Sequence, residues 1–379
     1  MSYPIINLMI SRQLNLIYSS IKGPVKQKLT LAQLFGSYSQ AMEPIIGKED
    51  FLTEPTGCVY CLEVYAKSPC LPGSHRSNLQ LCFGHQVRRG VSLFRVGSQS
   101  PGHGGAFAAV ADDASAVFWN PAGLVNLSNR QAMLMHAETF GELLNLDYMV
   151  AAFPYQSGAV GLSLMRLGGG GIKITALEDP NQPISEQNRV LLLREEGHAD
   201  YAFNFSYARR FTPALSWGLN AKVIYRDIPQ TSALGMGLDL GLLYQASTAI
   251  SFGANLQDAT FTFLSYATGS KETITPTLKL GTAWKRNWKD FTALLALDSD
   301  LRFEGRQYAA QYWVGDISAD NHYGAEIGYR QKLFGRAGFD QGDFTAGAGL
   351  IIRNFHLDFA YLSENQLDNS YRLSLIVEW

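Results

Sequence analysis

Large apolar side chains occupy every second position over most of the chain after about residue 130. Tyr201–Ala208 and Leu234–Tyr244 are the clearest examples, because each has one face of bulky apolar residues and one face of small or polar residues. In the first segment, the bulky face is Tyr201, Phe203, Phe205 and Tyr207, and the other face is Ala202, Asn204, Ser206 and Ala208. Side chains alternate between the two faces of a β-strand, so this period of two predicts an all-β chain.

The composition of the second face separates a membrane barrel from a soluble sandwich. A sandwich points its large apolar residues inward and presents charged residues to water. Here the second face is mostly Gly, Ala, Ser and Asn, which suits the polar lumen of a closed barrel whose outer surface meets lipid. Closure is required because an open sheet edge in hydrocarbon would leave backbone N–H and C=O groups unpaired. We therefore predict a transmembrane antiparallel β-barrel.

The connections between the alternating segments support the same fold. Short turns at 156–158 and 212–214 alternate with longer stretches at 168–198 and 258–275, as periplasmic turns and outer loops do in such barrels. About fifteen candidate strands fit the pattern, whereas bacterial barrels have an even number, so we expect fourteen. The surplus strand is either one between 299 and 342 or the weakly patterned one at 130–137.

Composition removes several other classes of protein. Hydrophobic residues make up 46% of the 379 residues and charged residues 17%, yet no apolar run is long enough for a transmembrane helix. A net charge of −2 with no basic stripe gives no basis for nucleic-acid binding. Four cysteines occur, and Cys58 and Cys61 form one CxxC, but Cys70 and Cys82 do not form the second closely spaced pair of a zinc site. We therefore expect neither a metal nor a cofactor.

Residues 1–92 differ from the rest of the chain. They mix Pro, Ser, Lys and the cysteines without a sustained period, so we expect little packed structure there. The opening "MSYPIINLMISRQLNLIYSS" has Arg12 inside its apolar run and no basic residue before it, which is a poor signal peptide. We interpret 1–92 as a poorly structured extension or a misassigned start.

The stretch "GGAFAAVADDASAVFWNPAGL", Gly104–Leu124, precedes the first predicted strand. It lacks the Lys-Ser or Lys-Thr of a phosphate-binding loop. Asp112 and Asp113 are adjacent and cannot face each other across one substrate, so they do not form an acid–base pair. The acidic residues suit the start of a helix that Asn120 and Pro121 end. We therefore expect this segment to have a structural role in packing and no catalytic or phosphate-binding role.

The same stretch resembles the N-terminal plug of the FadL superfamily of outer-membrane barrels, especially its PorV/PorQ-like branch. Further similar stretches follow in the usual order: "AKVIYRDIPQTSALGMGLDLGLLY", "ISFGANLQD", "GRAGFDQGDFTAGAGL", "LDFAY" and "YRLSL". The resemblance implies a plug at 93–129 inside a fourteen-stranded barrel at 130–379. It places Asn120, Pro121, Ala122 and Gly123 at the turn of the plug, and Asp112 and Asp113 hydrogen-bonded in the lumen.

The chain ends on an alternating strand with an aromatic last residue. Such an end resembles the signal by which the barrel-assembly machinery receives its clients. The residues that would form it are Tyr371, Leu373, Leu375, Val377 and Trp379.

Two functions are compatible with the resemblance, and both imply the bacterial outer membrane. The first, which we expect, is a PorV-like docking and shuttle role in type IX protein export, with secretion-system proteins as partners. The alternative is FadL-like uptake of a hydrophobic ligand. Only two loops look long, and the polar character of 168–198 favours docking, although Val190–Glu196 forms either an apolar contact or an extension of a strand. The histidines are scattered without a catalytic spacing, so we expect no enzyme.

Overall fold

In the computed structural model, residues 96–141, 143–364 and 368–379 are described. The cysteines and the predicted extension 1–92 lie outside these ranges, so both remain predictions. Within the described ranges the helices are short, and none is long and apolar enough to cross a membrane. They are α6 (Gln99–Gly102), α7 (Ala116–Trp119), and the 3-10 turns η1 (Pro121–Asn126) and η2 (Gln307–Ala309).

Antiparallel strands make up the remaining elements, in one sheet that closes on itself through the pairing of the first and last strands. They are β1 (Gln131–Thr139), β2 (Leu144–Tyr155), β3 (Gly158–Leu177), β4 (Val190–Arg210), β5 (Leu215–Ile228), β6 (Thr231–Gln245), β7 (Ile250–Gln257), β8 (Thr262–Tyr266), β9 (Lys271–Ile274), β10 (Thr277–Trp288), β11 (Phe291–Arg302), β12 (Tyr312–Val314), β13 (Ile317–Tyr329), β14 (Leu333–Asp340), β15 (Asp343–Ile352), β16 (Phe355–Leu362) and β17 (Ser370–Glu378).

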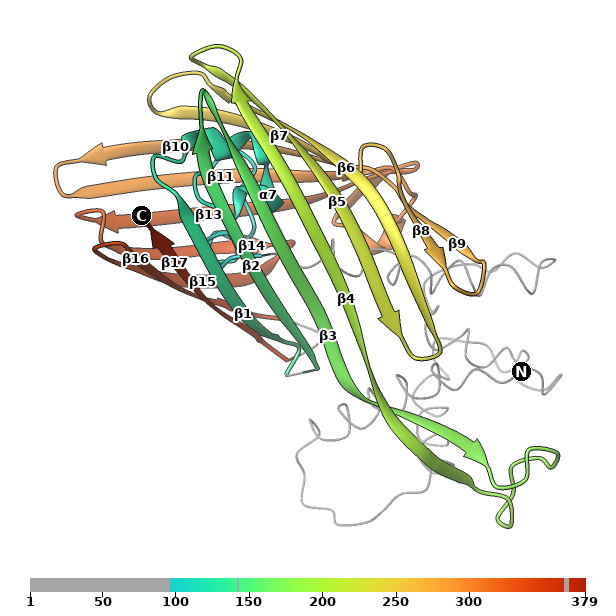
Figure 1. Cartoon of the computed structure of the whole chain (residues 1–379). Coiled ribbons are helices and arrows are strands. Elements are labelled where there is room, and N and C mark those ends of the chain that lie inside the picture. The colour runs from blue at the N-terminus through green and yellow to red at the C-terminus, as the bar shows by residue number, and fades with distance from the viewer. Residues whose placement is uncertain (1–95, 142, 365–367) are drawn as a thin grey trace, which may run out of the picture. The chain divides into compact units, whose positions relative to one another are not determined.

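All of these segments except β12 together form the fourteen strands of a closed barrel wall, which confirms the predicted fold class (Figure 1). β7 and β8 pair in succession with β6, and β9 pairs with β8 while β10 pairs with β7. β7 and β8 are therefore two parts of one interrupted strand, and β9 and β10 are two parts of the next. The short β12 lies beside β13, which explains the surplus strand expected between 299 and 342. The weakly patterned 130–137 segment is a genuine wall strand, β1.

The two stretches predicted to be long loops are largely strand. The 258–275 stretch holds β8 and β9, joined by a tight turn, and β3 and β4 extend into the 168–198 stretch from both sides. Val190–Leu193 begins β4, in agreement with the strand-extension reading. Residues 173–194 belong to a compact unit separate from the one that contains the barrel. Within that segment, the Asn188 side-chain amide donates to the Asp179 and Gln182 carbonyls, at 2.9 Å each.

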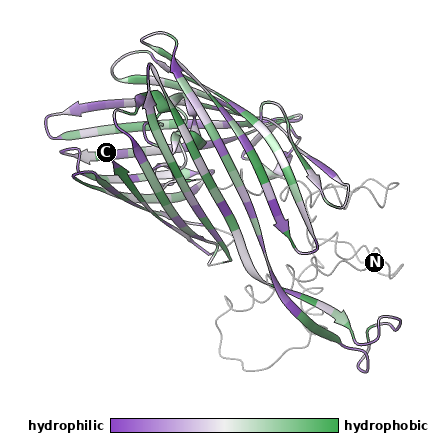
Figure 2. Cartoon of the chain, in the orientation of Figure 1, coloured by the Kyte–Doolittle hydropathy of each residue, from purple (hydrophilic) through white to green (hydrophobic). Residues whose placement is uncertain are grey.

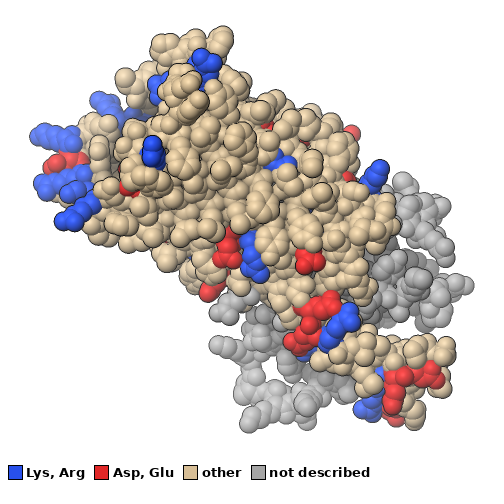
Figure 3. Space-filling view, viewed as in Figure 1, with Lys and Arg blue, Asp and Glu red and all other residues tan. Residues whose placement is uncertain are grey.

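The alternation read from the sequence matches burial in the wall. Phe203 and Phe205 are about half exposed on the outer face, while Asn204 and Ser206 between them are buried on the inner face. Figure 2 shows the corresponding bands of hydrophobic and hydrophilic residues along the strands. In Figure 3 most of the wall is a tan belt with few charges, and Lys and Arg gather towards one end. A wall with this apolar outer belt spans a membrane.

Candidate functional site

The lumen of the barrel is filled by residues 96–127, the plug. Its large side chains Phe107, Trp119 and Leu124 are at most 1% exposed, although no long helix or strand supports them. They pack against inward-facing side chains of β1, β2 and β3 in one hydrophobic cluster. The surrounding wall buries side chains that this segment is too short to bury alone.

Asn120 links the plug to itself and to the wall. Its side-chain amide donates to the Ala108 carbonyl of the plug at 2.8 Å and to the Leu242 carbonyl of β6 at 3.0 Å. Its side-chain oxygen accepts the Ala122 N–H at 3.2 Å and so begins η1. Asn120 is extended, as expected of a residue before proline, and this ends α7. Substituting this residue would release three plug contacts at once.

The turn formed by Pro121, Ala122 and Gly123 lies directly on the wall. A Cβ atom at Gly218 of β5 would collide with the backbone of Pro121 and Ala122. A Cβ at Gly123 itself would collide with the Ala111 carbonyl within the plug. Glycine at these two positions is therefore explained by the close approach of two backbones.

The two acidic residues of the plug lie in different surroundings. Asp113 is 5% exposed, and its Oδ1 accepts the N–H and hydroxyl of Ser115, at 2.8 and 2.5 Å. Its Oδ2 has no hydrogen-bond partner among the described residues. Burial raises the pKa of Asp113 to about 7, because desolvation disfavours the carboxylate. Asp112 differs from the expectation, since its side chain is 40% exposed and its carboxylate lies 3.9 Å from Lys285 Nζ.

Polar side chains of the wall hold the plug backbone from several sides. The strongest anchor is Asp298 of β11, which is 2% exposed. Its Oδ2 accepts the N–H groups of Phe107 at 2.7 Å and Ala108 at 2.6 Å. Further wall side chains that hydrogen-bond to plug backbone are Gln131, Arg210, Ser251, Asn255, Gln257 and Thr345. These contacts satisfy backbone groups that no helix or sheet pairs.

Charged side chains also face the lumen, and they are paired. Lys222 Nζ lies 2.8 Å from Asp239 and 2.6 Å from Asp258. Arg226 pairs with Asp200 at 3.0 Å. Further buried pairs and clusters include Lys279 with Asp300, Arg302 and Arg306 with Asp320, and Arg336 with Glu326 and Asp358. Pairing offsets the desolvation of each charge, so these groups brace the wall.

The alternation along the chain did not predict the apolar sector on the inner wall. The inward positions of β1, β2 and β3 carry no charged residue, in contrast to the polar lumen that the alternation elsewhere predicted. We define the apolar sector as the buried side chains Met133, Met135, Leu146, Tyr148, Val150, Met165 and Leu167. The outward positions mix apolar residues such as Leu134 and Met149 with polar ones such as His136, so bulky apolar residues do not mark one face and the alternation is hidden. This is why 130–137 looked like a weak strand.

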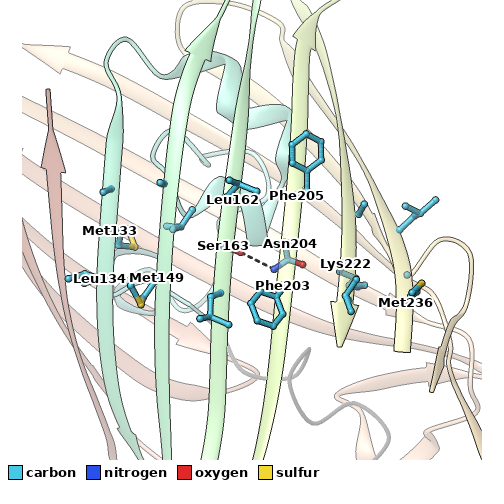
Figure 4. Close-up of a pocket in the computed structure, with 18 of the residues that line it drawn as sticks. Met133, Leu134, Met149, Leu162, Ser163, Phe203, Asn204, Phe205, Lys222 and Met236 are labelled. Carbon is cyan, nitrogen blue, oxygen red and sulfur yellow. Dashed lines mark hydrogen bonds between the residues drawn. The ribbon is translucent and has the colours of Figure 1, made fainter. Parts of the chain in front are cut away.

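The outer face of the same wall carries an open groove of about 850 Å³. Figure 4 shows Leu162, Phe203 and Met236 along it, while Ser163 and Asn204 hydrogen-bond to each other across β3 and β4 at 2.9 Å. Its exposed lining lies on the lipid-facing surface and not beside the plug. We therefore treat it as part of the membrane-facing surface.

The C-terminal strand β17 closes the barrel by pairing with the first strand, β1. Tyr371 and Leu373 face outward, and β17 pairs with β1 along its length. Leu375 and Val377 are partly exposed on that outer face. Trp379 stacks edge-on against Phe153 with ring centroids 6.3 Å apart. An assembly role for this segment remains a prediction.

Within the described ranges, no three His, Cys, Asp or Glu side chains are grouped as metal ligands. Asp113 and Asp112 point to different surroundings, so they do not act together on a substrate. The plug closes the lumen and is held there by hydrogen bonds, and one side of the lumen that it packs against is apolar.

No protein-family model matches the sequence, and no curated protein is recognisably similar to it. Solved structures do resemble its fold. The CymD monoaromatic hydrocarbon channel aligns with TM-score 0.50 and 14% identity over 75% of this chain and 97% of its own. The toluene transporter TodX of P. putida aligns with TM-score 0.51 and 11% identity over 75% and 98%. At these identities the likeness establishes the fold alone.

These comparisons correct the expected function. The prediction of a docking and shuttle role in type IX protein export is wrong, because the similar structures are transporters and channels and nothing points to protein export. Both stretches that looked like long loops, 258–275 and much of 168–198, are strand, so the polarity of 168–198 did not describe a docking loop. The similar proteins are also not enzymes.

Proposed function

We propose that the chain is an outer-membrane barrel of FadL type that takes up small hydrophobic compounds. The observation that carries the proposal is the apolar sector, a side of the lumen wall without inward charges that packs directly against the plug. An apolar solute meets no desolvated charge along it, whereas the remaining lumen is lined by ion pairs. The resemblance in fold to a hydrocarbon channel and a toluene transporter agrees with this proposal.

Passage requires the plug to shift, because Phe107 and Trp119 fill the lumen. Hydrogen bonds hold much of the plug backbone to the wall. Its contact with the apolar sector is mostly van der Waals packing, with one hydrogen bond from the Gly97 N–H to the Met135 sulfur at 2.9 Å. Packing against apolar side chains is non-directional and can be replaced by an apolar solute. Methionines such as Met133 and Met165 adapt their shape to such a solute.

The segment 173–194, taken by itself, adds a second apolar surface. Val190, Leu191, Leu192 and Leu193 are consecutive in β4 and each is about half exposed. Consecutive strand residues point to opposite faces, so both faces of this stretch present apolar surface. Exposed apolar patches commonly mark binding sites for ligands or partners. We propose that this stretch makes a first contact with the hydrophobic compound.

The remaining expectations fit this function. Short turns in outer-membrane barrels face the periplasm, which places the turns at 156–157 and 330–332 on that side. Its proposed partners are the barrel-assembly machinery and the surrounding outer-membrane lipid. The resemblance of the sequence motifs to the PorV/PorQ-like branch remains a prediction, and it carries no role in protein secretion.

The proposal is tested by uptake of radiolabelled toluene into vesicles with lipopolysaccharide in the outer leaflet, which slows passive entry. Met165→Gln places an amide in the apolar sector, at a cost of roughly 1–3 kcal/mol when unpaired. We expect uptake about tenfold slower. Met165→Leu conserves volume and apolarity, so it should leave uptake close to that of the wild type. Uptake equal to that of protein-free vesicles, or insensitive to Met165→Gln, would contradict the proposal.

A further inference from the structure

One rim of the barrel is rich in basic side chains. It is the rim formed by the short turns and by the ends of β1 and β17, which the strand pairings bring to the same edge. The exposed basic residues there are Arg130, Arg209, Arg210, Lys285, Arg286, Lys289, Arg330, Lys332 and Arg353. We call this set the basic rim, and it accounts for the Lys and Arg gathered at one end in Figure 3.

Few acidic side chains offset the basic rim. In the described part of the chain, Asp290 is exposed there and lies 3.5 Å from Arg330 Nε. Asp112 and Glu378 are only partly exposed. The opposite rim has the reverse balance, with exposed acidic residues and Lys271 as an exposed base. The exposed acidic residues are Glu138, Asp227, Asp316 and Asp368.

Aromatic side chains fix the depth of the basic rim. Trp288 packs edge-on against Trp284, with ring centroids 6.2 Å apart, and Phe291 packs against Tyr329 at 5.1 Å. The Arg286 guanidinium lies 5.5 Å from the centre of the Trp288 ring. Arg330 stacks in the same way on Tyr329, at 5.1 Å. Aromatic girdles of membrane barrels lie at the level of the lipid headgroups. The basic rim therefore lies where headgroups surround the barrel.

We propose that the basic rim binds anionic phospholipid headgroups of the adjoining leaflet. The distribution of charge favours lipid over a protein partner, because basic residues occur around the circumference. Arg209 lies at the end of β4, Lys289 between β10 and β11, Lys332 between β13 and β14, and Arg353 between β15 and β16. A leaflet contacts the whole circumference, whereas a docked protein would contact one arc. Guanidinium groups already oriented over aromatic rings present their N–H donors to phosphate at little entropic cost.

The test measures which lipids the barrel holds at its surface. The full chain is reconstituted in phosphatidylcholine vesicles with spin-labelled phosphatidylglycerol or spin-labelled phosphatidylcholine, and electron paramagnetic resonance gives the motionally restricted fraction of each. We expect the anionic lipid to be several-fold preferred at low salt. We expect the preference to fall towards unity at high salt, because salt screens exposed charges.

Matched double variants locate the effect. Lys289→Gln with Lys332→Gln removes two charges from the basic rim, and Lys173→Gln with Lys271→Gln removes two exposed lysines elsewhere. Each lysine close to an anionic surface contributes about a fivefold preference at most. We expect the first pair to lose at least half of the preference and the second to keep it. If the rim variant does not fold, the salt dependence of the wild type still decides.

Three results would overturn the proposal. One is equal association of the two lipids with the wild-type barrel. Another is an equal loss of preference in both double variants. The third is binding of a polyglutamate peptide that is lost in the rim variant while the lipids remain unselected, which would assign the basic rim to an acidic protein.

Discussion

Removing the carboxylate of Asp298 tests whether hydrogen bonds to the wall keep the plug closed. In Asp298→Ala, the N–H groups of Phe107 and Ala108 lose an acceptor that lies 2.7 and 2.6 Å away. A buried donor left unpaired costs roughly 1–3 kcal/mol, and removing the buried carboxylate returns part of that cost. We therefore expect the plug to be about 3 kcal/mol less stable in its closed position. This raises the open population by about a hundredfold.

Asp298→Asn is the matched control. The Oδ1 atom of Asp298 has no hydrogen-bond partner among the described residues, whereas Oδ2 accepts both plug N–H groups. An asparagine keeps one oxygen with two lone pairs in place of Oδ2 and puts its amide in place of Oδ1. We expect a much smaller change in this variant.

Amide hydrogen exchange of the plug peptide around Phe107, measured in detergent by mass spectrometry, reports the open population. Asp298→Ala should exchange about a hundredfold faster than the wild type and Asp298→Asn less than tenfold faster. Strand peptides of the wall should keep their protection in both variants. Unchanged protection of the plug in Asp298→Ala would refute the reasoning, as would equal loss of protection from the wall, which would signal global unfolding.

Three further predictions follow from single contacts. Because burial raises the pKa of Asp113 to about 7 from 3.8, the neutral acid is favoured in the closed plug, so its stabilising contribution is complete below pH 3.8 and lost as the pH rises through 7. The plug loses at most about 4 kcal/mol of stability in this way. The rate of plug proteolysis, corrected for the pH dependence of the protease, should therefore depend less on pH in Asp113→Asn than in the wild type. Gly218→Ala should leave a folded, heat-modifiable barrel whose plug no longer fits against β5, so solute flux into vesicles should increase. Gly335→Ala is the control, because a Cβ there meets open space, and its flux should equal that of the wild type. Equal flux in the two variants would contradict the close approach of the plug to Gly218. Trp379→Ala should lower the amount of assembled barrel in cells several-fold while urea stability of the purified protein changes by about 1 kcal/mol or less, and normal assembly would remove the proposed signal.

Local pattern was sufficient for the wall because burial of a strand residue depends on which face it occupies. Phe203 and Asn204 illustrate this: one face meets lipid and the other the lumen, and their order along the chain states which is which. The closed sheet followed, because unpaired edges are too costly in hydrocarbon. The plug was predicted from a resemblance at Gly104–Leu124, and its small residues agree with its confined place in the lumen.

Tertiary structure decided what faces what across the lumen. Asp298 is 191 positions from Phe107 and yet accepts its N–H, and no local pattern in β11 marks this acid as an anchor. The apolar sector on β1–β3 was hidden for a related reason. Where neighbouring inward and outward positions are both apolar, the period of two disappears from the sequence. Met133 and Leu134 are such a pair, and only the closed barrel shows that Met133 faces the lumen and Leu134 faces outward. The sequence thus determined the strands and their faces, because these depend on neighbours along the chain. The partners of the plug and the apolar side of the lumen depend on contacts that form only when the first and last strands pair.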